Sequence, residues 1–230
     1  MKKFITLLVA MVIAAMYFSS CHVQSPTAKQ SEKDCGVVAV DLGLPSGTLW
    51  ADRNVGAALP EDYGDCFAWG ETTTKSKYEW ATLKYCEDNN GDRFNKYNTQ
   101  SKYGNIDNKT ILECTDDAAT ANWGSNWCMP TQQQFQELCD NCTWTWTTRN
   151  GKNGYEVKGK NVNSIFFPAA CSRSRTPLYD EESDGSYWSS SLSTFDSYCG
   201  RKFGFNSSGM DPDGWASRRY GFSVRPVRCK

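Results

Sequence analysis

Histidine is almost absent from this chain of 230 residues, which contains a single one, His22. His22 lies near the N-terminus, before the part of the sequence that we expect to fold. Ser-His-Asp and Cys-His catalysis, histidine zinc sites and the HExxH motif all need a histidine within the folded domain. The sequence therefore argues against these hydrolase and metalloenzyme classes.

An excess of charge of one sign is also missing. The 25 Lys and Arg residues nearly balance the 26 Asp and Glu residues, and the net charge is -1. The two signs are spread along the chain without a basic stripe, so we expect no nucleic-acid partner. No internal repeat is evident either.

Long apolar runs are lacking except at the N-terminus. Residues 4–18 are apolar apart from Thr6, and they follow Lys2 and Lys3. About 15 apolar residues are too few to span a bilayer comfortably, since roughly 20 are needed. A basic start, a short apolar run and the small residues Ser19 and Ser20 predict a secretory signal peptide over residues 1–20. The alternative is an uncleaved N-terminal anchor.

Cys21 directly follows this signal. Residues 18–21 (FSSC) resemble a bacterial lipobox, although Phe18 stands where leucine is usual. The resemblance implies that Cys21 is lipidated, and several acyl chains would hold the protein on a membrane. Residues 22–33 are polar and aperiodic, which predicts a flexible tether from 21 to 33. We expect a lipoprotein of the cell envelope, anchored in the outer membrane and facing the surface or the periplasm. Ordinary cleavage, with Cys21 a free thiol, is the alternative.

Residues 34–230 have the size of one domain with a sizeable core. They are rich in aromatic residues, and frequent glycine and asparagine turns separate the aromatic stretches, which favours β-structure. Besides Cys21 the chain has ten cysteines, an even number that permits disulfides in an exported protein. The sequence leaves their pairing open.

We predict an α+β fold with twisted antiparallel sheets, two helices and long loops. Thr115 is expected to cap a short helix up to residue 123, and Thr131 with Gln134 has the spacing of a capping box for a second helix. Phe135 and Leu138 lie on the apolar face of that second helix. Strands are expected at residues 37–42, 48–55, 144–148, 155–158, 165–170, 187–191, 201–205 and 219–227, and packed loops over residues 56–110.

Three side-chain groups could support chemistry, and each has a simpler explanation. Cys139 and Cys142 have CxxC spacing but share the apolar helical face, so buried thiols are favoured. Residues 88–92 begin like a calcium loop but lack its glycine and its final glutamate, which favours a polar turn. The carboxylates of residues 181, 182 and 184 could suit glycoside hydrolysis, but nothing positions them. We therefore assign no catalytic residue, metal or cofactor.

The segment from residue 185 to 219 is typical of a recognition surface. It mixes tyrosine and tryptophan with serine, asparagine, glycine and arginine. A turn at 206–209 and a loop at 211–214 are expected to expose side chains on a rigid scaffold. The predicted ligand-binding residues are Tyr198, Asn206, Asp211, Trp215, Arg218 and Arg219. The alternative is that Trp215 packs beneath the loop and Arg218 pairs with Asp213. Trp188 and Tyr220 are expected in the core.

Several sequence blocks carry a family resemblance. They are residues 40–51 (VDLGLPSGTLWA), 64–72 (GDCFAWGET), 116–119 (DDAA), 123–131 (WGSNWCMPT), 187–191 (YWSSS) and 221–227 (GFSVRPV). Together they resemble the Fibrobacter succinogenes major paralogous domain, a family of exported bacterial proteins, over nearly all of the mature chain.

The resemblance implies a C-type-lectin-like fold, shared with formylglycine-generating enzymes and retroelement-diversified variable proteins. No cysteine pair stands in the sequence context of those enzymes' active site. The resemblance therefore implies a binding module for a glycan or a protein, not an enzyme, with its ligand face near the C-terminal segment. A structural envelope component without a soluble ligand, and an enzyme of the formylglycine-generating type, are the alternatives.

Overall fold

The computed structural model describes residues 36–170, 172–173, 178–179 and 183–229, which belong to one compact unit, Lys33–Lys230. The signal peptide, Cys21, the tether and two of the three carboxylates considered for hydrolysis, Glu181 and Glu182, lie outside the described residues. The described part is α+β, with antiparallel sheets and two α-helices, as the sequence predicts. None of the helices in these ranges is long and apolar enough to cross a membrane.

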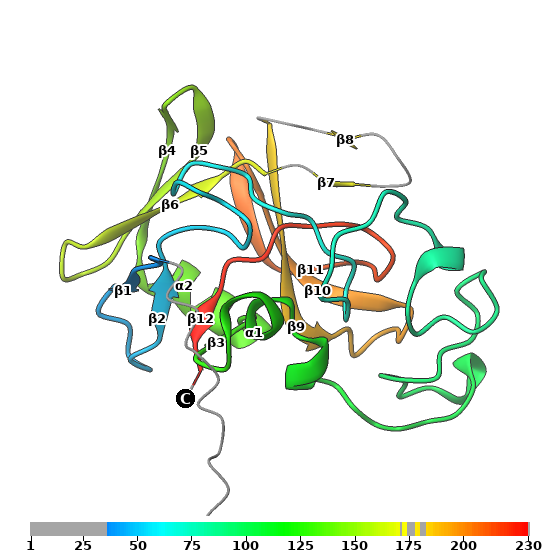
Figure 1. Cartoon of the computed structure of the whole chain (residues 1–230). Coiled ribbons are helices and arrows are strands. Elements are labelled where there is room, and N and C mark those ends of the chain that lie inside the picture. The colour runs from blue at the N-terminus through cyan, green and yellow to red at the C-terminus, as the bar shows by residue number, and fades with distance from the viewer. Residues whose placement is uncertain (1–35, 171, 174–177, 180–182, 230) are drawn as a thin grey trace, which may run out of the picture. The chain divides into compact units, whose positions relative to one another are not determined.

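A three-stranded antiparallel sheet forms the centre of the domain (Figure 1). Its strands are β9 (Asp184–Leu192), β10 (Cys199–Asn206) and β11 (Gly209–Ser217), with β10 in the middle. The prediction of an exposed loop at residues 211–214 is wrong, because these residues lie inside β11. The register between β10 and β11 shifts after Lys202, and this irregularity accommodates Pro212, which cannot donate a ladder hydrogen bond.

A second sheet is a hairpin with one added strand. It contains β4 (Thr143–Arg149), β5 (Lys152–Lys158) and β6 (Ser164–Pro168) in that order. Asn150 and Gly151 form the two-residue turn, and both have positive φ, at 49° and 79°. Positive φ at both positions is the backbone that Asn-Gly favours between two strands, so the predicted hairpin is confirmed.

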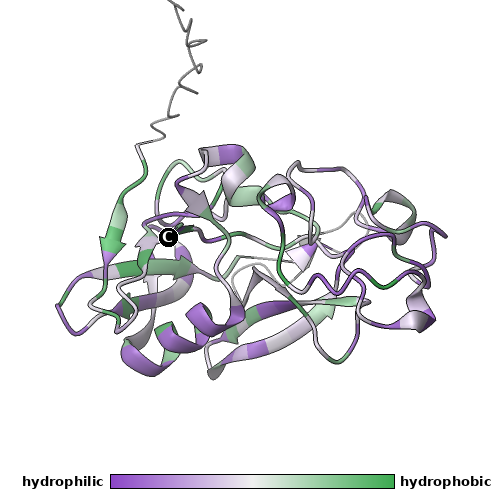
Figure 2. Cartoon of the chain, turned by 90° about the horizontal axis from the view of Figure 1, so that it is seen from below, coloured by the Kyte–Doolittle hydropathy of each residue, from purple (hydrophilic) through white to green (hydrophobic). Residues whose placement is uncertain are grey.

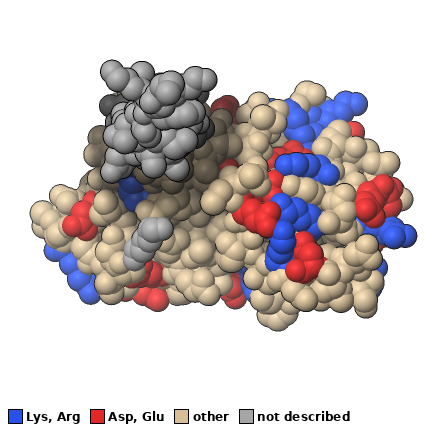
Figure 3. Space-filling model, turned by 60° about the horizontal axis from the view of Figure 1, so that its bottom comes forward, with Lys and Arg blue, Asp and Glu red and all other residues tan. Residues whose placement is uncertain are grey.

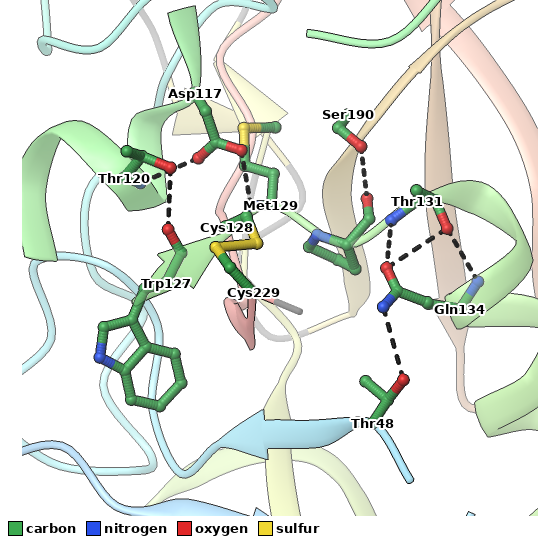
Figure 4. Close-up of a disulfide and its surroundings, with 11 residues drawn as sticks. Thr48, Asp117, Thr120, Trp127, Cys128, Met129, Thr131, Gln134, Ser190 and Cys229 are labelled. Atoms are coloured by element: carbon green, nitrogen blue, oxygen red, sulfur yellow. Dashed lines mark hydrogen bonds between the residues drawn. A yellow bond between two sulfur atoms is a disulfide. The ribbon is translucent and has the colours of Figure 1, made fainter. Parts of the chain in front are cut away.

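A four-stranded sheet joins distant parts of the chain in the order β1-β2-β12-β3. The strands are β1 (Ala39–Asp41), β2 (Leu49–Ala51), β3 (Trp127–Cys128) and β12 (Val227–Arg228). Cys229, which follows β12, forms a disulfide with Cys128 of β3 across 101 residues (Figure 4). A short pair, β7 (Ser172–Arg173) and β8 (Leu178–Tyr179), completes the described strands.

Side-chain caps fix the beginnings of both helices. Thr131 caps α2 (Gln132–Asn141), and its reciprocal bonds with Gln134 form the predicted capping box (Figure 4). The prediction that Thr115 caps the first helix is wrong. Residues Cys114–Asp116 form a 3-10 turn, η3, and Asp117 caps α1 (Ala118–Trp123) by accepting from the Thr120 N–H at 2.9 Å. The second Asp117 oxygen accepts from the Met129 N–H, which ties α1 to the start of the α2 region.

The core consists of three apolar clusters. One lies under α2, where the Phe135 ring is 5.3 Å from Trp50 and 5.0 Å from Phe203. A second gathers around Trp69 and Trp188, both fully buried. The third fills the long loops of residues 56–110, whose only helical turns are η1 (Trp80–Thr82) and η2 (Ser101–Tyr103). Hydrophilic and hydrophobic residues mix in helices and strands alike (Figure 2), as expected for elements that bury one face each.

Candidate functional site

The six predicted ligand-binding residues occupy four places in the structure. Asn206 and Asp211 lie at the β10–β11 end of the central sheet, and Trp215 lies further along β11. Tyr198 and Arg219 contact Trp80, and Arg218 lies inside the domain. The six residues therefore do not lie together in one place.

Arg218 is fully buried, which corrects the prediction that it faces a ligand. Its guanidinium donates to the carbonyl oxygens of Lys96, Tyr97 and Ser197 at 3.0–3.2 Å. The rings of Trp69 and Phe94 lie 5.0 and 4.4 Å from its central carbon. Burial lowers the pKa of Arg218 to about 10. Arg218 therefore joins the long loops to the central sheet and supports the fold.

A second arginine has the same kind of role. Arg225 is also fully buried, and it donates to the Asn54 side chain at 2.8 Å and to the Phe166 carbonyl at 2.9 Å. Both arginines supply several donors to carbonyl groups that strands and loops leave without partners. These contacts explain how a domain with many loops satisfies its buried backbone.

Tyr198 and Arg219 form a partly buried cluster with Trp80. The Tyr198 and Trp80 rings are 4.6 Å apart, and the Arg219 guanidinium lies 5.7 Å from the Trp80 ring. These contacts hold η1 against the β11 exit. Because the three side chains cover one another, they present little free area for a ligand.

Trp215, by contrast, is 60% exposed on the face of the central sheet that packs on α2. The sheet register places it directly opposite Arg201 of β10. Opposite residues of an antiparallel pair point to the same face and lie about 5 Å apart at the β-carbons. Asp213, two residues earlier, points the same way and accepts a hydrogen bond from Gln132 at the start of α2 at 2.8 Å. The alternative in which Trp215 packs beneath a loop is excluded.

Arg201 is buried, and two residues hold its guanidinium in place. It donates to the side chain and the carbonyl oxygen of Asp213, both at 2.8 Å, and to the Thr194 hydroxyl at 3.3 Å. Asp213 thus pairs with Arg201, whereas the sequence-based alternative paired it with Arg218. The ion pair and the Gln132 contact together fix the backbone from which Trp215 projects.

Phe195 packs against Arg201. Its ring is 5.2 Å from the guanidinium carbon, within the range of a cation–π contact, and its side chain is 74% exposed. We call Phe195, Arg201, Asp213 and Trp215 the aromatic surface. Phe195 contacts the Arg201 guanidinium, Trp215 lies opposite Arg201 in the sheet register, and both aromatic side chains are open to solvent.

The sequence interpretation missed Phe195 and Arg201. Arg201 alternates with Phe203 and Phe205 on β10, and this period of two places it on their face of the sheet. A charged residue in phase with buried phenylalanines is a signal that could have identified it. Phe195 gives no such signal, because it stands in a short connection without periodicity.

The remaining candidates act in the structure of the domain. Burial raises the pKa of Cys139 to about 12 and that of Cys142 to about 11, which keeps both thiols protonated. Asp88 accepts backbone N–H groups of Asn90, Gly91 and Asp92, as expected of a polar turn. Within the described ranges, no three His, Cys, Asp or Glu side chains gather closely enough to hold a metal ion.

Asp116 organises a further charged cluster at the edge of the long loops. It is almost fully buried and accepts from Lys84, Lys96, Tyr85 and Tyr97. Burial raises the pKa of Asp116, but these four hydrogen bonds outweigh burial and hold the pKa well below its usual value. Every oxygen of this carboxylate has partners, so the cluster stabilises the loops and offers no open acid or base.

Charges on the exposed surface alternate in sign. On the face of Figure 3, lysine and arginine side chains lie next to aspartate and glutamate side chains, and neither sign covers a continuous area of the described residues. Recognition on such a surface depends on shape and local contacts more than on a long-range field.

Comparison with known proteins gives no match. No protein-family model, no curated protein and no solved structure matches this chain.

Proposed function

We propose that the protein is a non-enzymatic, lipid-anchored binding module of the cell envelope that recognises a glycan or a protein through the aromatic surface. The proposal includes membership of the Fibrobacter succinogenes major paralogous domain family and its C-type-lectin-like fold. The antiparallel sheets, the two helices and the long packed loops are compatible with that fold. The lipid on Cys21 would place the module in the outer membrane.

One observation supports this function most strongly. Phe195 and Trp215 are large aromatic side chains, and both are more than half exposed. Arg201 and Gln132 bond to Asp213, two residues before Trp215, and the Phe195 carbonyl accepts from the Gln100 side chain. Exposed aromatic area that is ordered before binding costs little conformational entropy when a ligand covers it. Tryptophan and arginine are also the residues that dominate binding energy at protein interfaces.

A combined glycan and peptide array tests the proposal. The wild-type chain should bind members of at least one of the two arrays, and Trp215→Ala and Phe195→Ala should each abolish or strongly weaken those signals. Val162→Ala is a matched control, because Val162 is 72% exposed and lies outside the aromatic surface, in the turn before β6. Silence on both arrays would favour the structural-component alternative, and equal loss in all three variants would assign the loss to misfolding.

A further inference from the structure

A groove opens on the opposite face of the central sheet from the aromatic surface. It has a volume of about 380 Å³, within the range of small-molecule sites, and it is lined chiefly by Asp184, Ser186, Lys202, Gly204, Asn206 and Asp211. Two of these residues, Asn206 and Asp211, were predicted from the sequence to bind ligand. The groove shares no residue with the aromatic surface.

Glycine shapes the floor of the groove. Gly204 pairs with Ser186 of β9 on one side and with Asp211 of β11 on the other, so all three residues face the groove. A β-carbon added at Gly204 would collide with the Lys202 Nζ atom. The Lys202 side chain therefore runs along β10 and places its ammonium directly over Gly204, between the two neighbouring strands.

The hydrogen-bond donors of the Lys202 ammonium have no acceptor among the described residues. The ammonium makes no hydrogen bond or ion pair with any residue in the described ranges, and its closest aromatic neighbour is the Phe222 ring, 5.9 Å away. Burial lowers the pKa of Lys202, and the negative charges of Asp211 and Asp184 offset part of that effect. A half-buried ammonium with three donors and no acceptor favours a ligand that brings an oxygen atom.

The carboxylates around the Lys202 ammonium favour a ligand that donates hydrogen bonds. Asp211 Oδ1 accepts from the Asp213 N–H at 3.1 Å, and Asp184 Oδ2 accepts from the Ser183 hydroxyl at 2.6 Å. Each carboxylate keeps acceptor capacity, and the Asn206 side-chain oxygen already accepts from Ser208, which leaves its NH₂ group as a donor. A simple anion would pair with Lys202, but the two carboxylates would repel it. A simple cation would be repelled by the lysine.

Adjacent hydroxyl groups fit this mixture of donors and acceptors, because each hydroxyl both donates and accepts. We propose that the groove binds a single neutral sugar unit, with Lys202 donating to a sugar oxygen while Asp184 and Asp211 accept from sugar hydroxyls. The missing side chain of Gly204 leaves the space that the Lys202 ammonium occupies above the sheet. This sugar site is separate from the aromatic surface, and it would stand even if the aromatic surface bound no ligand.

Saturation-transfer NMR on the whole chain tests the sugar site with glucose, galactose, mannose and N-acetylglucosamine as probes. At least one of them should bind, and Lys202→Met should weaken it at least tenfold, because methionine keeps the apolar stem and removes the donors. Lys158→Met is the matched control, since Lys158 is an exposed lysine on β5, and it should leave affinity unchanged. Asp211→Asn, at an exposed position, should also weaken binding and serves if Lys202→Met does not fold.

Three results would overturn the sugar site. One is the absence of binding by all four sugars. Another is binding that Lys202→Met and Asp211→Asn leave intact. The third is binding of a free amino acid such as glycine in place of the sugars, which would indicate that the groove selects a zwitterion. Trp215→Ala should keep full sugar affinity, so failure of the aromatic surface and failure of the groove give different patterns.

Discussion

Replacement of Arg218 by alanine should destabilise the domain and not act on ligand binding directly. The change removes three hydrogen bonds from a charged donor, each worth about 1.5–3 kcal/mol, and leaves three carbonyl oxygens without that partner. Relief of the desolvated charge and entry of water offset part of the loss. We expect a loss of about 3–5 kcal/mol in the free energy of unfolding, which for a domain of this size corresponds to roughly 10 °C in Tm.

Thermal and urea unfolding followed by circular dichroism measures this effect. Trp215→Ala is the comparison, and its exposed side chain should change the free energy of unfolding by no more than about 0.5 kcal/mol. Arg218→Lys should also destabilise, because an ammonium cannot reach three carbonyls in the planar geometry of guanidinium. If Arg218→Ala costs less than about 1 kcal/mol, the assignment of Arg218 as the link between loops and sheet is wrong.

Three further predictions concern stability and location. Asp116→Asn should cost about 1–3 kcal/mol, because it removes the charge of a buried carboxylate that accepts from two lysines and two tyrosines. The pKa of Asp116 is lowered in the folded state, so its contribution to stability is fully present above the unfolded pKa of about 3.9. That contribution is lost as pH falls from there through the folded pKa, and Asp116→Asn should therefore flatten the acid side of a stability–pH curve. Leu138→Ala should cost about 2–5 kcal/mol in urea unfolding, because Leu138 is fully buried under α2, and a change under about 0.5 kcal/mol would contradict that packing. Cys21→Ser should move the protein from the membrane to the soluble fraction of cells, and a variant that still sediments with membranes would contradict lipidation.

Local sequence patterns predicted the local structure well. The Thr131 capping box, the Asn150-Gly151 turn and the buried face of α2 depend on residues within a few positions of one another, and all three are confirmed. The first helix shows the limit of such patterns. Thr115 and Asp117 are both good caps, and the contact of Asp117 with Met129, twelve residues away, decides between them.

The candidate site was harder to predict, because exposure depends on distant segments. Arg218 and Arg219 are neighbours of the same type, and only the packing of residues 96–97 against the sheet shows which one is buried. Period-two alternation places Lys202 on the face of the sheet opposite to the core phenylalanines, and this pattern predicts a solvent-exposed side chain. Phe222 lies on that face, however, and Lys202 is half-buried in a groove.

The most direct test of the proposed function is a titration of the strongest array ligand against Trp215→Ala and Phe195→Ala. The aromatic surface predicts that each variant loses at least about 1 kcal/mol of binding free energy, a factor of roughly five, while its Tm stays within about 2 °C of wild type. Val162→Ala should bind as the wild type does. Unchanged affinity in both aromatic variants, with Tm preserved, would contradict recognition through this surface.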